Sequence, residues 1–264
     1  MIFGSKKKEK KYNFIVQGTG FSVVLLHGLM GNLSNFKFLK EFLVYNNYKV
    51  FILSLPLYSL PILSTSVMGI AKYVNKFLIE IVKEPAILVG NSLGGHIALL
   101  IALKYPNLTK GLVLTGSSGL YERSFGETFP KRGDYEYIKR KTEEVFYNPA
   151  TATKELVDEI YNVVNNRVKA IKTVNIARSA IRNNLINELK KITIPVLLIW
   201  GKQDNITPPE VAEDFYRNIL NSELHWIDKC GHAPMMEKPK EFNILILSWL
   251  KKINENKKYH LCKK

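Results

Sequence analysis

The chain is built from two kinds of hydrophobic pattern. Short, mostly apolar runs bounded by Gly, Pro or charged residues are typical of strands covered on both faces. Between them lie longer segments whose apolar residues recur three or four positions apart, which predicts helices. The predicted strands are 13–17, 22–26, 49–53, 86–89, 111–115, 194–200 and 223–227, with 13–17 at an edge. Strands that alternate with helices predict an α/β fold, with a mostly parallel, doubly wound sheet.

The pattern changes between Ser117 and Lys191. Strand-type runs of Val, Ile and Leu disappear there, and charged, amphipathic segments at 134–146, 154–164 and 167–183 replace them. A stretch of this kind between two strand signals predicts a helical insertion. We therefore expect a core formed by 12–116 and 192–253, an inserted helical segment at 117–191, and basic, flexible tails at 1–11 and 254–264.

A nucleophile motif lies at the centre of the pattern. Gly90-Asn91-Ser92-Leu93-Gly94 joins the strand at 86–89 to an apolar helix. Between strand and helix, Gly-x-Ser-x-Gly is typical of a nucleophile elbow, a sharp turn that strains the serine backbone and exposes its hydroxyl. Gly90 and Gly94 have no Cβ, so strand and helix can pass close to each other.

A serine nucleophile needs a base, and the base needs an acid that orients it. Asp204 and His232 each follow one of the last two predicted strands. Because the carboxyl ends of parallel strands meet at one edge of the sheet, both side chains are expected near Ser92. Asp228 is closer to His232 in the sequence, but it lies where its strand ends, so we rank it second.

Two backbone amides are predicted to bind the oxyanion of a reaction intermediate. The amide of Leu93 directly follows the nucleophile. Leu29 lies in a turn where Gly28 and Gly31 would allow an unusual backbone path. His27, in the same turn, is expected to hold the loop through hydrogen bonds rather than to act in catalysis.

Composition limits the other functions. With 264 residues, 46% hydrophobic and 23% charged, the chain is typical of a globular domain. No apolar run approaches the roughly 20 residues of a membrane span, so we expect no stable membrane insertion. No apolar segment follows the basic N-terminus, which argues against a secretory signal. Cys230 and Cys262 do not suggest a disulfide, and these features predict a cytoplasmic protein.

The formal net charge of +15 could indicate nucleic-acid binding. Such binding needs basic residues clustered on one face. The lysines are instead spread along the chain and concentrate only at its two ends. We therefore expect no nucleic-acid partner, and interpret the charge as a bias in composition.

Taken together, the motifs resemble the α/β-hydrolase fold superfamily over nearly the whole chain. They are Leu26-His27-Gly28-Leu29-Met30-Gly31, the elbow with Gly95-His96, Trp200-Gly201-Lys202-Gln203-Asp204 and Gly231-His232-Ala233-Pro234. The resemblance implies a hydrolase with Ser92, Asp204 and His232 as its catalytic triad, no cofactor or metal, and a small-molecule substrate. It also implies that 117–191 is a cap over the pocket.

Thr115–Leu120 looks like the cap junction of the subgroup that includes meta-cleavage-product hydrolases and small carboxylesterases. A Ser nucleophile differs from the Asp of haloalkane dehalogenases and epoxide hydrolases. Ester and C–C bonds both remain open as the bond cleaved, and so does a ligand-binding protein on the same scaffold with little turnover.

The substrate pocket is predicted from the first part of the insertion, 117–130. It carries Leu120 and Phe125, which favour a mainly apolar substrate, and Arg123, which could pair with a substrate carboxylate. The apolar residues of the three later helical segments are interpreted as packing those helices together. They are Tyr137, Val145, Phe146, Leu156, Ile160, Val163 and Val164.

Overall fold

The computed structural model describes residues 5–9, 11–122 and 132–261, and its described part contains one sheet of eight strands. The order across the sheet is β1-β2-β4-β3-β5-β6-β7-β8, and all neighbours from β4 to β8 are parallel. The strands are β1 (Ser5–Glu9), β2 (Tyr12–Gln17), β3 (Phe21–Leu26), β4 (Tyr48–Leu53), β5 (Ala86–Asn91), β6 (Thr109–Thr115), β7 (Val196–Gly201) and β8 (Ser222–Ile227). The predicted mostly parallel α/β sheet is confirmed.

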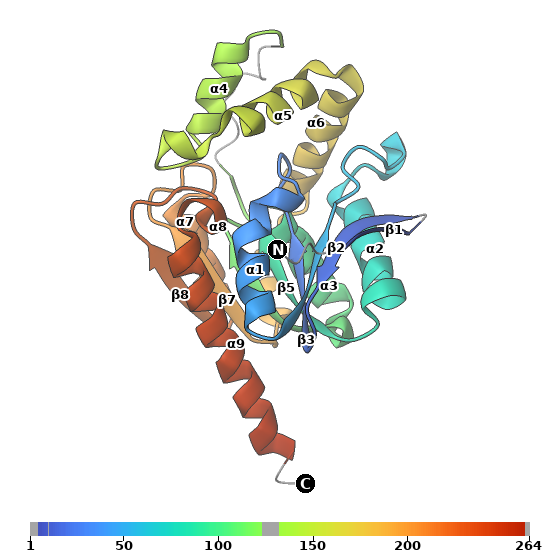
Figure 1. Ribbon diagram of the computed structural model, residues 1–264, viewed down its shortest axis with the longest axis vertical. Coiled ribbons are helices and arrows are strands. Elements are labelled where there is room, and N and C mark those ends of the chain that lie inside the picture. Colours follow the sequence, from blue (N-terminus) through green and yellow to red (C-terminus); the bar gives the residue numbers. More distant parts are fainter. Residues whose placement is uncertain (1–4, 10, 123–131, 262–264) are drawn as a thin grey trace.

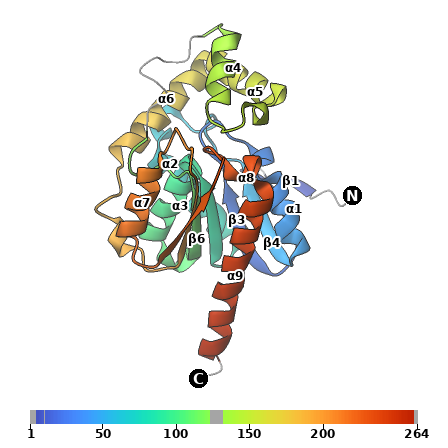
Figure 2. The ribbon, with the colours of Figure 1, turned by 90° about the vertical axis from the view of Figure 1, so that its left-hand side faces the viewer.

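Helices cover both faces of this sheet (Figures 1 and 2). On β3, Val24 and Leu26 pack into one core and Val23 and Leu25 into the other, because successive side chains of a strand point to opposite faces. The first core includes α2 (Val67–Phe77), α3 (Leu93–Lys104) and α7 (Pro209–Asn218). The second includes α1 (Lys37–Tyr45), α8 (Pro234–Glu237) and the start of α9 (Pro239–Leu261).

The segment between β6 and β7 is helical, as the pattern predicts. It holds α4 (Tyr135–Glu143), α5 (Lys154–Asn165) and α6 (Arg167–Arg182), and its described residues form no strand. Each helix begins at a side-chain cap, with Asp134, Thr153 and Asn166 accepting a backbone N–H of the first turn. Figures 1 and 2 show the three helices above the edge where the parallel strands end. We call this segment the helical insertion.

Several hydrogen bonds tie the helical insertion to the core, and two groups of them bear on the site. On α6, the buried Lys172 donates hydrogen bonds from Nζ to the carbonyl oxygens of Tyr58 and Leu60, at 2.8 and 2.6 Å. Near the end of α4, the Val145 carbonyl accepts the backbone N–H of His232 at 2.9 Å. The second contact joins the insertion to a candidate site residue.

The ends of the chain differ from the predicted pattern. Residues 5–9 pair with β2 as an antiparallel strand, so β2 lies between β1 and β4 and the prediction that 13–17 is an edge strand is wrong. At the other end, α9 continues to Leu261 and projects from the core (Figure 1). Within the described ranges, no helix combines the length and apolar character that a membrane span requires.

Candidate active site

Ser92 sits in the strained turn that its motif predicts. Its φ of 53° and ψ of −121° place a non-glycine residue in a left-handed region, between β5 and the first residue of α3. A Cβ at Gly90 would lie 2.4 Å from the Gly95 nitrogen, and one at Gly94 would lie 2.0 Å from the Leu26 carbonyl oxygen. Both glycines are therefore required by the close passage of backbone segments, as expected.

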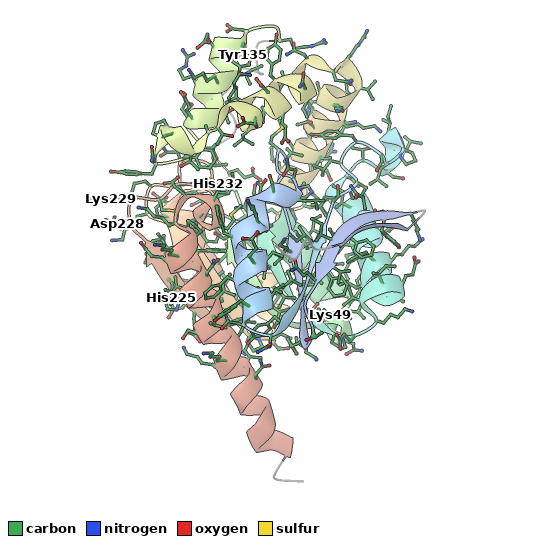
Figure 3. All side chains as sticks on the ribbon, viewed as in Figure 1. Lys49, Tyr135, His225, Asp228, Lys229 and His232 are labelled. Atoms are coloured by element: carbon green, nitrogen blue, oxygen red, sulfur yellow. The ribbon has the colours of Figure 1, made fainter. Side chains whose placement is uncertain are left out.

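Asp204 and His232 form a buried pair. His232 Nδ1 lies 2.9 Å from Asp204 Oδ2 and 3.1 Å from Oδ1. Asp204 is 2% exposed and His232 is 6% exposed, so solvent screens their interaction little. Asp228 instead lies near Gln203 and Lys202, and Figure 3 shows it with Lys229 on the outer rim, away from His232. Asp204 is thus the acid that contacts the candidate base.

The pair sets the electrostatics of the site. Burial lowers the pKa of His232, but the charge and hydrogen bond of Asp204, with a contribution from the charge of Glu122, raise it above its ordinary value overall. The imidazole therefore holds a proton more readily than an isolated one, which suits a group that must accept a proton and later return it.

The loop that carries His232 is held against the elbow. Asn91 Nδ2 donates to the backbone oxygens of both His232 and Thr115, each at 3.0 Å. Gly116, with φ of 50°, lies so close that a Cβ there would be 2.8 Å from His232 Nδ1. These contacts fix the imidazole beside the turn that carries Ser92.

The two residues predicted to supply amide donors lie at the start of α3 and in the cavity wall. Leu93 is the first residue of α3, where backbone N–H groups have no acceptor within the helix. Leu29 lines the same cavity as Ser92. Neither Gly28 nor Gly31 has a positive φ. The glycines are explained by space: a Cβ on Gly28 would lie 3.2 Å from Ser92 Cβ, and one on Gly31 would lie 2.9 Å from Asn35 Nδ2.

His27 has the structural role that the sequence suggests. Its Nδ1 lies 2.9 Å from the Gly28 carbonyl oxygen, and its Nε2 accepts the Leu55 N–H at 3.0 Å. Burial lowers its pKa to about 4, so the ring stays neutral and keeps both hydrogen bonds at neutral pH. His27 thereby holds the loop that carries Leu29.

Ser92 and His232 open on one cavity of about 390 Å³. Its lining is mostly apolar and comes largely from the inner faces of α4, α5 and α6, including Ile138, Phe146, Leu156, Ile160, Val163, Val164, Val174 and Ile181. Charged side chains also reach it: Glu122, Lys141 and Arg178. Among the described residues, no three His, Cys, Asp or Glu side chains converge where they could hold a metal ion.

Of the predicted pocket residues, only Leu120 falls within the described residues. Leu120 is buried in the core and does not line the cavity, because Gly119 and Leu120 bond through their carbonyl oxygens to Leu185 and Asn184 of the returning chain. Phe125 and Arg123 lie outside the described residues. Conversely, the helical residues interpreted as mere packing, Tyr137 to Val164, all line the cavity.

Sequence reasoning also missed two polar residues at the site. Glu122 lines the cavity and acts on His232 through its charge. Thr207 is fully buried against both Asp204 and His232. The only sequence signal for Thr207 is its place three residues after Asp204, where a Thr side chain and amide can bond back to the carboxylate.

Comparisons with known proteins place these features in a family. Residues 22–239 match the alpha/beta hydrolase fold family. A 2-hydroxy-6-oxononadienedioate/2-hydroxy-6-oxononatrienedioate hydrolase from a Pseudomonas species is 27% identical, covering 86% of this chain and 87% of its own length. A monoacylglycerol lipase of Mus musculus is also 27% identical, over 73% of this chain and 64% of its own length.

A solved structure extends the likeness to the whole fold. An alpha/beta hydrolase enzyme from the metagenome of sediments from the lagoon of Mar Chica, Morocco, is 45% identical, with a TM-score of 0.79. The match covers 94% of this chain and 98% of that one.

Proposed function

Because the chain belongs to the alpha/beta hydrolase fold family, and so to the hydrolases, we propose that it cleaves a carboxylic ester of a small, mainly apolar molecule through an acyl-enzyme. One observation carries the proposal: a serine on a strained turn opens on the same apolar cavity as a histidine that is paired with a buried aspartate. In this proposal Ser92, His232 and Asp204 are the catalytic triad.

The first half of the reaction forms the acyl-enzyme. Ser92 Oγ attacks the carbonyl carbon of the ester while His232 Nε2 accepts the hydroxyl proton. Asp204 holds the proton on Nδ1, which leaves Nε2 free to act as the base, and stabilises the imidazolium that forms. The negative charge on the carbonyl oxygen is bound by the amides of Leu93 and Leu29, and the N-terminus of α3 adds its positive dipole end.

The second half returns the enzyme to its starting state. The imidazolium gives its proton to the leaving alcohol, which departs as the tetrahedral intermediate collapses to the acyl-enzyme. Water then attacks the acyl carbon with His232 again as base. The carboxylic acid leaves, and the proton returns to Ser92.

The helical insertion acts as the cap in this proposal. Its apolar inner faces would bind the hydrocarbon part of the substrate by removing it from water, a gain of about 0.8 kcal/mol for each buried methylene. A cavity of about 390 Å³ falls in the range typical of small-molecule sites.

Filling the cavity from the cap should change the preference for chain length. Ile160 of α5 lines the cavity and is half-buried, so the Trp side chain of Ile160→Trp has room to enter it. We expect kcat/KM for a p-nitrophenyl octanoate to fall about tenfold or more, while the acetate ester changes little, because the longer chain loses several buried methylenes. The measurement is the ratio of the two kcat/KM values.

Val168→Trp is the matched control. Val168 lies on the neighbouring helix α6, is 57% exposed and does not line the cavity. Its substitution should leave the ratio unchanged. An unchanged ratio in Ile160→Trp as well would place the acyl chain outside this cavity.

Covalent labelling and turnover test the proposed function itself. A fluorophosphonate should modify Ser92, as identified by mass spectrometry of the digested protein. With p-nitrophenyl butyrate, the chain should then release many equivalents of product per protein. A single stoichiometric burst would instead support the alternative of a ligand-binding protein with little turnover, and labelling of another residue would contradict the assignment of Ser92.

Cleavage of a carbon–carbon bond is the second candidate. It is favoured by the Pseudomonas hydrolase, whose name gives a 2-hydroxy-6-oxo-dienedioate as its substrate and which aligns over 86% of this chain. Assaying such a dienoate beside the ester panel separates the two candidates. The bond with the higher kcat/KM is the one that the site is built to cleave.

A further inference from the structure

Thr207 is a third side chain in contact with the Asp204–His232 pair. It is fully buried, and its Oγ1 lies 2.9 Å from Asp204 Oδ2 and 3.3 Å from His232 Nδ1. The carboxylate oxygen that Thr207 contacts is also the one closest to the imidazole, at 2.9 Å. Because the carboxylate can only accept, the hydroxyl donates to it.

The backbone of Thr207 is held by hydrogen bonds at both its N–H and its carbonyl oxygen. Its backbone N–H and that of Ile206 donate to Asp204 Oδ1, at 3.0 and 2.8 Å. Its carbonyl oxygen accepts the indole N–H of Trp200, a fully buried residue of β7, at 2.8 Å. These bonds hold the Thr207 backbone beside the carboxylate, so its hydroxyl is within hydrogen-bond distance of Asp204 Oδ2.

We propose that Thr207 is a positioning residue that shares the Asp204 carboxylate with His232 and thereby limits how strongly Asp204 holds the imidazole. The inference rests on the proposed function and assigns a residue that the triad alone does not include.

The physical reason is competition for one acceptor. A hydrogen bond donated to a carboxylate stabilises its negative charge and makes it a weaker acceptor for a second donor. Without the Thr207 hydroxyl, Asp204 Oδ2 would be left with the imidazole N–H as its donor, in a buried setting with little screening. The imidazolium would be bound more tightly and would give up its proton less readily.

The charged groups around His232 otherwise stay the same. Asp204 and Glu122 both favour the charged imidazole. Lys141 of α4 and Arg178 of α6 line the same cavity, and Lys141 is paired with Glu144 at 2.6 Å. A change at Thr207 touches none of these side chains except Asp204.

The test is the pH dependence of kcat/KM for p-nitrophenyl butyrate in Thr207→Val, which keeps the branched shape and removes the hydroxyl. We expect the apparent pKa of the acid limb to rise by about 0.5 to 1, because that limb reports the imidazole in the free enzyme. The loss of rate should therefore be about threefold to tenfold near pH 6 and largely recovered at pH 9. A merely structural defect would lower the rate equally at every pH.

Two variants make the comparison sharp. Thr207→Ser keeps the hydroxyl, so its acid limb should stay at the wild-type position. Thr109→Val removes another buried threonine hydroxyl, at the first residue of β6. This hydroxyl has no hydrogen-bond partner among the described residues. This variant should leave the pH profile unchanged.

A measurement without substrate separates this inference from the proposed function. In a proton NMR spectrum, the resonance of the His232 Nδ1–H should move downfield in Thr207→Val as its bond to Asp204 strengthens. Turnover that did not depend on Ser92 would overturn the proposed function, whatever the NMR result. An unmoved acid limb and an unmoved resonance in Thr207→Val would overturn the role assigned to Thr207, with the proposed function intact.

Discussion

Ser92→Ala should lower kcat for ester hydrolysis by about 10⁴-fold or more, because it removes the hydroxyl that would form the acyl-enzyme. The residual rate would come from the Leu29 and Leu93 amides and from substrate binding. The KM should change much less than kcat, since the hydroxyl contributes mainly to the transition state. Steady-state kinetics with p-nitrophenyl butyrate measures both values.

Ser66→Ala is a matched control for this prediction. Ser66 caps α2, with its Oγ accepting the Gly69 N–H at 3.1 Å, and lies outside the site. It should cost about 1 kcal/mol of stability and leave kcat unchanged. Equal rates for wild type and Ser92→Ala would remove Ser92 from the mechanism.

The strained backbone of Ser92 also predicts an effect on stability. A non-glycine residue with the backbone angles of Ser92 costs on the order of 1–3 kcal/mol, and glycine relieves that cost. Ser92→Gly should therefore raise the free energy of unfolding by about 1 kcal/mol while abolishing activity. Chemical denaturation measures the gain. A loss of stability would show that the hydroxyl, rather than the backbone, decides the local energetics.

The sequence could predict the elbow and the Asp204–His232 pair because residue type and strand topology fix them. The glycines around Ser92 are required by close backbone contacts within a few residues, and those contacts are encoded by residue type. Asp204 and His232 each follow a buried parallel strand, and topology brings the ends of such strands to one edge. The choice of Asp204 over Asp228 follows from the same rule.

The extra strand at the start of the chain could not be predicted in this way. Residues 5–9 are Ser, three lysines and Glu, with no apolar position to show a strand period. Their pairing with β2 uses backbone groups at the edge of the sheet. Backbone hydrogen bonding of this kind does not depend on hydrophobic residues, so their pattern does not predict it.

The residues that line the cavity could not be predicted from the sequence, for a different reason. An apolar stripe such as Ile160, Val163 and Val164 shows which face of a helix avoids water, and it has the same spacing whether that face packs or surrounds a space. The distance between the helices and the sheet decides which occurs. Contacts such as Lys172 with Tyr58 set that distance, and they join residues more than a hundred positions apart.

Asp204→Asn should lower kcat by about 10⁴-fold at neutral pH while keeping the fold. The amide oxygen can take the place of Oδ1 and accept the N–H groups of Ile206 and Thr207. The NH₂ group then stands at Oδ2, where it donates to His232 Nδ1. Since Nδ1 must now accept, the imidazole proton moves to Nε2, and the ring can no longer take the proton of Ser92.

Asp228→Asn is the matched control for Asp204→Asn. Asp228→Asn changes an exposed carboxylate near Gln203 and Lys202, so it should leave kcat within about twofold, because surface charges contribute little. Far-ultraviolet circular dichroism and thermal unfolding should show both variants folded. If Asp228→Asn lost activity and Asp204→Asn kept it, the acid of the triad would be Asp228, and the buried contact between Asp204 and His232 would serve only to hold the loop.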